Sequence, residues 1–292
     1  MSLWQTYYLA HHLNDALQAL AEAPESALII AGGTDLLLDL QQGRHPPVHT
    51  LVDITSVPEM TAIEMRQGEL FIGSAAPLNQ IVRSALAAEH AQALVEAADL
   101  IGGPQVRNTA TLGGNVAHAL PAADGTISLL ALGAEAEIAD REGLRRVNLE
   151  TLFLGPGRSA LKPGAEILAG FYISARRAGQ GSAFRRVMRP QGVALPIINM
   201  AARLERQGER IENVHIAIGP SGPIPQRLRA AEEVLRGGPY NTDQIALAIE
   251  AVLATARFRT SPYRASQEYR RSLVHSLMLE TLQAAWERSF EA

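Results

Sequence analysis

The chain has 292 residues, of which 47% are hydrophobic and 19% are charged, and its formal net charge is −4. These values are typical of a folded protein with a sizeable core, and they argue against a disordered chain or a nucleic-acid partner. Because the chain has no cysteine, it can form no disulfide, use no thiolate nucleophile and ligate no iron–sulfur cluster.

The amino-terminal segment has no basic start and no long apolar run, so we expect neither a signal peptide nor a membrane span and predict a cytoplasmic protein. Lys162 is the only lysine, which excludes a phosphate-loop lysine elsewhere. A proline pair between His45 and His49 prevents a shared helical face, so these residues predict no metal site.

Apolar spacing and turn residues predict the elements of the first third. They are a helix over 13–23, a buried strand over 27–30, a helix capped by Thr34 and ended by Gly43, strands over 49–55 and 69–77, and one or two helices over 78–101. No strict βαβ repeat is apparent in this region.

Short apolar runs and turn signals in the middle of the chain predict antiparallel strands over 134–149, 166–174, 181–188 and 196–220. Apolar stripes predict helices over 241–256 and 266–290. We place a domain boundary near residues 177–181 and predict an α+β fold.

Two segments contain paired glycines, "AGGTD" at 31–35 and "TLGGN" at 111–115. Glycine pairs let backbone N–H groups approach a ligand closely, so Gly113 and Gly114 are expected to act as donors. Either segment alone is more typical of a tight turn. Together, and with Asp124 behind the second, they favour a nucleotide site, although neither matches the Rossmann or the P-loop motif.

The longer stretches "IIAGGTDLL" and "GGPQVRNTATLGGNVAHALPAAD" resemble the FAD-binding subunits of the molybdenum hydroxylases, a family that includes xanthine dehydrogenases. "SPYRASQEYRR" extends the resemblance over nearly the whole chain. The resemblance implies an FAD-binding domain of the vanillyl-alcohol-oxidase (PCMH) type over 1–176, with subdomains of about 1–55 and 56–176. It further implies a C-terminal domain over 177–292, with a small antiparallel sheet and a helical bundle.

The resemblance also implies which residues bind FAD. Gly32, Gly33 and Thr34 contact the pyrophosphate. Leu168 and Arg185 lie near the isoalloxazine, and Asp124 forms a hydrogen bond to the flavin nucleotide. For His118 two interpretations stay open, a cofactor contact and a buried histidine held by protein groups. The full set is Ile29, Ile30, Ala31, Gly32, Gly33, Thr34, Asp35, Leu36, Ile101, Thr111, Gly114, Asn115, His118, Asp124, Leu168 and Arg185.

The implied function is electron transfer through FAD, with no catalytic acid or base on this chain. Since the chain lacks cysteine, two [2Fe–2S] clusters would lie on a separate iron–sulfur subunit and molybdopterin on a large subunit, in a heterohexamer. The acceptor is NAD⁺, dioxygen or another oxidant. It stays open because the loop 189–196 lacks the acidic residue that relatives often carry. The alternatives are a stand-alone FAD oxidoreductase of the same fold class and a non-catalytic binding or assembly module.

Overall fold

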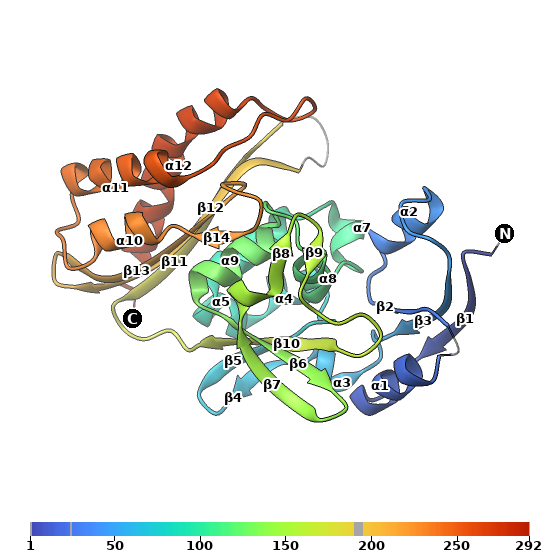
Figure 1. The fold of residues 1–292 in the computed structure, drawn as a ribbon. Coiled ribbons are helices and arrows are strands. Elements are labelled where there is room, and N and C mark those ends of the chain that lie inside the picture. Colours follow the sequence, from blue (N-terminus) through green and yellow to red (C-terminus); the bar gives the residue numbers. More distant parts are fainter. Residues whose placement is uncertain (1, 24, 190–194, 292) are drawn as a thin grey trace.

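Residues 4–53 form a three-stranded parallel sheet with two helices in this computed structural model, which describes residues 2–23, 25–189 and 195–291. The strands lie in the order β1-β3-β2, and the helices connect them (Figure 1); the elements are β1 (Trp4–Leu9), α1 (Leu13–Glu22), β2 (Ala27–Ile30), α2 (Leu36–Gln41) and β3 (Val48–Asp53). The expectation that this region has no βαβ repeat is therefore wrong. Strand β1 is an edge strand with five exposed residues, so its sequence lacks the alternation that marks a half-buried strand.

The second part is a five-stranded antiparallel sheet in the order β4-β5-β10-β6-β7. Its strands are β4 (Ile63–Arg66), β5 (Glu69–Gly73), β6 (Glu135–Asp140), β7 (Gly143–Asn148) and β10 (Ile167–Ser174). A short pair, β8 (Phe153–Gly155) and β9 (Arg158–Ser159), follows the 3₁₀ helix η1 (Leu149–Leu152).

The helices of this second part pack on the sheet or on one another, largely around an alanine- and leucine-rich core. They are α3 (Pro58–Thr61), α4 (Leu78–Arg83), α5 (Ala85–His90), α6 (Gln92–Leu100), α7 (Pro104–Arg107), α8 (Leu112–Ala117) and α9 (Asp124–Leu132). The stretch 78–101, expected as one or two helices, holds three, because Ser84 caps α5 with its hydroxyl and Ala91 separates α5 from α6.

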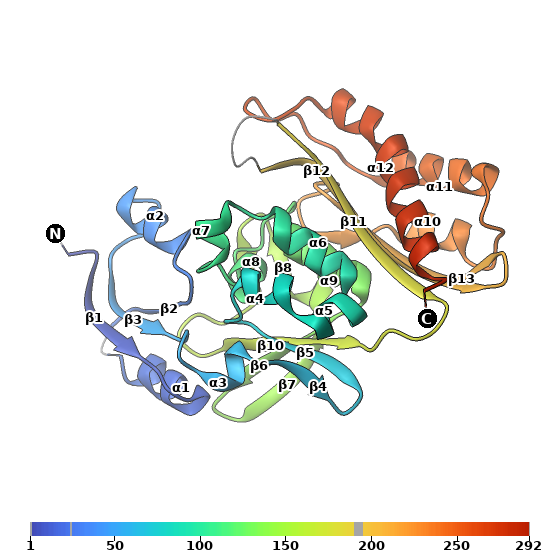
Figure 2. The same cartoon turned by 180° about the vertical axis from the view of Figure 1, so that it is seen from behind.

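The C-terminal part is a four-stranded antiparallel sheet in the order β11-β12-β13-β14. Its elements are β11 (Gln180–Met188), β12 (Pro196–Gln207), β13 (Arg210–Gly219), β14 (Gln226–Arg227), α10 (Arg229–Leu235), α11 (Thr242–Thr255) and α12 (Gln267–Arg288). Helices α10 and α12 cover one face of the sheet, and α11 packs on both of them (Figure 2). The other face packs on α6 and α9, so these two helices join the second part to the C-terminal part.

Among the helices in the described ranges, none combines the length and the apolar character required to cross a bilayer.

Candidate cofactor site

The two glycine segments lie against each other, and we call residues 31–36 the first loop and residues 109–118 the second loop. A β-carbon placed on Gly32 would lie 2.8 Å from the α-carbon of Ala110 and closer still to the carbonyl oxygen of Thr109. Real β-carbons essentially never approach backbone atoms so closely, so this contact requires glycine. The fold thus brings together two segments that sequence analysis assigned to one ligand.

The backbone amides of the first loop have no protein partner. Within the described ranges, the N–H groups of residues 31–36 donate no hydrogen bond. The first amide with a protein acceptor is that of Leu37, which donates to the Gly33 carbonyl at 3.0 Å. Gly33 has a left-handed φ of +66°. Successive free amides around such a turn form a concavity that attracts an anion.

Thr34 was expected to cap the helix that follows the first loop, but Asp35 occupies the N-cap position of α2 and its side chain makes no capping hydrogen bond. The Thr34 hydroxyl has no hydrogen bond to another described residue. The loop therefore presents both backbone and side-chain donors that no part of the described fold uses.

The second loop differs, because its glycine amides are already engaged. Gly113 N–H donates to the Ser74 carbonyl at 2.7 Å, and Gly114 N–H donates to the Thr111 hydroxyl at 3.1 Å. Thr111 is the N-cap of α8. These amides fix the loop to the chain after β5 and close the first turn of α8, and a contact of Gly113 and Gly114 with a ligand stays a prediction.

Asn115 ties the second loop to the next helix. Its Oδ1 accepts a hydrogen bond from Thr126 N–H at 3.2 Å, and a β-carbon on Gly125 would lie 2.8 Å from the same oxygen. Gly125 therefore lets α8 and α9 approach. The Nδ2 group of Asn115 has no acceptor within the described part of the chain and stays available to a ligand.

His118 and Asp35 connect the two loops through their side chains. His118 Nδ1 lies 3.7 Å from Asp35 Oδ2, and both side chains are partly exposed. The nearby carboxylate of Asp35 raises the pKa of His118, and the same contact holds the pKa of Asp35 below its usual value. The structure thus gives His118 a protein partner on the opposite loop rather than a position in the core.

Asp124 is buried at the junction with the C-terminal sheet. Its carboxylate accepts hydrogen bonds from Arg186 Nη1 at 2.6 Å and from Asn199 Nδ2 at 2.5 Å. Burial raises the pKa of Asp124, while Arg186 and Asn199 oppose that effect. Both oxygens therefore have protein partners, and a bond from Asp124 to the nucleotide stays a prediction.

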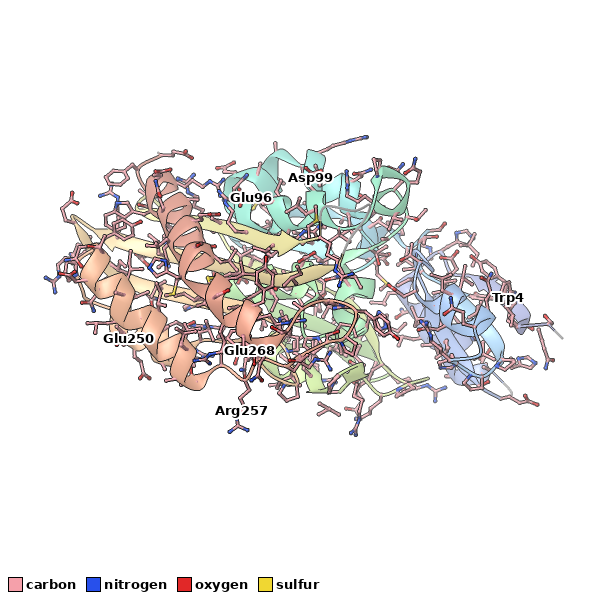
Figure 3. All side chains as sticks on the ribbon, turned by 90° about the horizontal axis from the view of Figure 1, so that it is seen from above. Trp4, Glu96, Asp99, Glu250, Arg257 and Glu268 are labelled. Carbon is pink, nitrogen blue, oxygen red and sulfur yellow. The ribbon has the colours of Figure 1, made fainter. Side chains whose placement is uncertain are left out.

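Arg185 lies at a second charged junction between the two parts of the chain. Its Nη1 donates to Glu96 Oε1 at 2.8 Å, and Arg288 donates to the same carboxylate with both Nη groups, at 3.0 and 2.6 Å. Glu96 also accepts from Phe184 N–H at 2.8 Å. Figure 3 labels Glu96 on α6, beside the strands of the C-terminal sheet. Burial alone would raise the pKa of Glu96, but these donors hold it below its usual value.

Four residues of these junctions are not predicted from the sequence: Glu96, Arg186, Asn199 and Arg288. Their partners are 62 to 192 positions away in the chain, and a single sequence carries no signal for such pairs.

The remaining predicted residues are apolar and occupy regular elements or their ends. Ile29 and Ile30 lie in β2, and Leu36 is the first residue of α2. Ile101 follows α6 as its C-cap, and Leu168 is buried in β10 at an irregularity of the ladder with β6. Of the loop 189–196, residues 190–194 lie outside the described part, so its position beside the flavin is untested.

A cavity of about 520 Å³ lies along α4 and reaches Asn108, which precedes the second loop. It is lined by Asn79, Arg83 and Asn108 among others, but by no residue predicted to bind FAD. Asn79 donates to Asn108 and accepts from Arg107 Nε at 3.3 Å, so its amide already has protein partners. The loops, rather than this cavity, define the candidate site.

Residues 3–173 match a family model described as "FAD binding domain in molybdopterin dehydrogenase". The chain belongs to this family. A second model, "CO dehydrogenase flavoprotein C-terminal domain", matches residues 182–285 of this FAD-binding subunit.

Relatives and solved structures agree with the assignment. The FAD-binding subunit is 32% identical over 282 residues to the xanthine dehydrogenase FAD-binding subunit of Escherichia coli O157:H7, covering 96% of this chain and 95% of the relative. It is also 32% identical over 278 residues to the nicotine 6-hydroxylase medium subunit of Paenarthrobacter nicotinovorans, covering 95% of each. Carbon monoxide dehydrogenase from Hydrogenophaga pseudoflava superposes with a TM-score of 0.91 at 26% identity, covering 97% of this chain and 98% of that one.

These matches confirm the resemblance, the α+β fold with its FAD-binding and C-terminal parts, and FAD as the cofactor. The chain is an oxidoreductase flavoprotein subunit. The first loop suits the anionic diphosphate of FAD, because the amides of residues 31–36 have no partner among the described residues. The individual FAD contacts and the domain limits at 176 and 177 stay predictions.

Proposed function

We propose that this chain is the electron-transfer subunit of a molybdenum hydroxylase, and that it receives electrons from a separate iron–sulfur subunit and delivers them to NAD⁺, dioxygen or another acceptor. One observation carries the proposal. The N–H groups of residues 31–36 have no partner among the described residues, and they belong to a loop that contacts the second loop in a member of an FAD-binding family.

In this proposal the first loop holds the FAD diphosphate through its backbone amides and the Thr34 hydroxyl. Backbone N–H groups suffice for this task without a lysine. The second loop is held in place and bounds the other side of the site, because the Gly113 and Gly114 amides are hydrogen-bonded within the protein. Its free side-chain donor is Asn115 Nδ2, which we assign to the cofactor.

Ile101 and Leu168 would offer apolar surface to the isoalloxazine, and Arg185 would place a positive charge near it, with Glu96 holding its guanidinium. The bound flavin supplies the redox chemistry, while the protein supplies position and electrostatics. We assign no acid or base to the chain.

The partners follow from the chemistry that the chain lacks. Without cysteine it cannot ligate iron–sulfur clusters, so a donor of this kind lies on another chain. Relatives bear names such as "Nicotine 6-hydroxylase medium subunit" and "Carbon monoxide dehydrogenase medium chain", which describe one subunit of a larger enzyme. We extend this arrangement to the present chain, with an iron–sulfur subunit and a molybdopterin-binding large subunit.

The test has two steps. The purified chain is denatured and the released nucleotide identified; we expect about one FAD per chain. Flavin reduction is then followed by absorbance after mixing with a pre-reduced iron–sulfur subunit from the same genome, and separately with NADH. Reduction by the iron–sulfur subunit fits the proposal, and reduction by NADH would identify NAD⁺ as the acceptor. Turnover of an organic substrate by the isolated chain would instead favour a stand-alone oxidoreductase.

A further inference from the structure

One acid and one base face each other across the two loops, His118 Nδ1 and Asp35 Oδ2, at 3.7 Å. Residues 31–36 and 109–118 contain no lysine or arginine, and apart from this pair they contain no other charged or titratable side chain. His118 is therefore the only side chain of either loop that can carry a positive charge.

The arginine that precedes the second loop is engaged elsewhere. Arg107 lies 3.4 Å from Asp99 and donates to the Gly102 carbonyl at 3.0 Å and to Asn79 at 3.3 Å. Its guanidinium is thus held on the α6–α7 side of the loop. A diphosphate between the loops would meet backbone amides from one side and a single ionisable base from the other.

We propose that Asp35 is a positioning residue that keeps a proton on His118, so that an imidazolium facing the first loop stabilises the FAD diphosphate and makes FAD retention depend on pH. This inference rests on the proposed position of FAD between the two loops. It concerns a pair of side chains, whereas the amide cradle of the first loop is independent of pH.

The charges around His118 favour its protonated form. Asp35 and, more weakly, Asp39 of α2 act on the imidazole, and among the described residues these are the charged groups that shift it. The nearby carboxylate of Asp35 raises the pKa of His118, and the same contact lowers the pKa of Asp35, so each side chain favours the ionised form of the other. The imidazolium is present below the raised pKa and is lost as the pH rises through it.

Release of FAD from the purified flavoprotein, followed by the rise in flavin fluorescence between pH 5.5 and 9, tests the inference. We expect the release rate to rise up to about fivefold across the titration of His118, the range for a partly exposed ion pair. In His118→Gln the rate should be high and independent of this titration. In Asp35→Asn the midpoint should move to lower pH, because His118 then loses its proton more easily.

His275→Gln is the matched control, since His275 is exposed on α12, and it should behave as the wild type. A purely structural role for the pair would change the release rate equally at all pH values and leave the midpoint in place. A His118→Gln protein that keeps the wild-type pH profile, or an unmoved midpoint in Asp35→Asn, would overturn the proposal.

The wild-type protein offers a second readout that needs no variant. The pKa of His118, measured by NMR of its imidazole protons, should be higher with FAD bound than after FAD removal. An equal or lower value with FAD bound would contradict the inference while leaving the proposed function intact. A chain that takes up no FAD at any pH would instead contradict the proposed function.

Discussion

The α-carbon of Gly32 packs against the carbonyl oxygen of Thr109, and this backbone contact joins the two loops of the candidate FAD site. The contact explains why a glycine is needed here, since a β-carbon would also lie 2.8 Å from the Ala110 α-carbon. Backbone atoms cannot yield as a flexible side chain can. The two loops can therefore approach this closely only because Gly32 has no β-carbon.

Gly32→Ala is expected to force the loops apart. Because a small displacement of a preorganised site weakens binding strongly, we expect FAD affinity to fall by at least about tenfold. The measurement is the FAD content after gel filtration, with affinity from flavin fluorescence. Gly155→Ala is the control, because its β-carbon would meet only the Arg158 side chain at an ordinary 3.7 Å. Full FAD retention by Gly32→Ala would show that the loop contact does not shape the site.

Glu96→Gln should destabilise the protein by about 2 kcal/mol, since it removes the charge shared by Arg185 and Arg288 at the junction of α6 with the C-terminal part. Equilibrium unfolding in urea measures the loss. Because the pKa of Glu96 is held below its usual value, its contribution is present at neutral pH and is lost as the pH falls through the lowered pKa. Glu89→Gln, at an exposed position of α5, should change stability little.

Asp124→Asn distinguishes a junction residue from a cofactor ligand. It leaves the buried Arg186 without its carboxylate, and Arg186 Nε already lacks a partner, so we expect a loss of about 3 kcal/mol in the FAD-free protein. Asp99→Asn, which removes an exposed carboxylate, should cost less than about 1 kcal/mol. Unchanged stability of the FAD-free Asp124→Asn protein with weakened FAD binding would assign the residue to the nucleotide instead.

His215 is expected to make the protein acid-sensitive. Burial, reinforced by the nearby Arg227, lowers the pKa of His215 to about 4. The unfolded chain then binds the extra proton first, so stability is complete above about pH 6.5 and declines as the pH falls towards 4, by about 3 kcal/mol at most. His215→Gln should flatten this part of the stability profile measured by thermal unfolding. An identical acid profile in wild type and variant would refute the assignment.

The glycine segments and the strongly patterned elements could be predicted from sequence. Strands β5, β10 and β11 and helices α11 and α12 carry apolar periodicity, and they fall within a few residues of the expected ranges. Strand β1 escaped because an exposed edge strand needs no alternating pattern. Its omission concealed the βαβ arrangement that delivers the first loop.

The details of the site were harder to predict because they depend on contacts between distant residues. "AGGTD" and "TLGGN" look equivalent in sequence, but the amides of the first loop have no partner among the described residues, whereas Gly113 N–H bonds to Ser74 after β5. Likewise, no local pattern around Arg185 predicts its hydrogen bond to Glu96, which lies 89 positions away in the chain. Local pattern identifies the chemistry available, and tertiary contacts decide which groups remain for the ligand.

Hydrogen exchange of the backbone amides at residues 31–36, compared with and without FAD, tests the central claim most directly. The account predicts that FAD protects these amides strongly, while Gly113 and Gly114, already bonded within the protein, change much less. Stoichiometric FAD binding that leaves exchange at residues 31–36 unchanged would contradict the account.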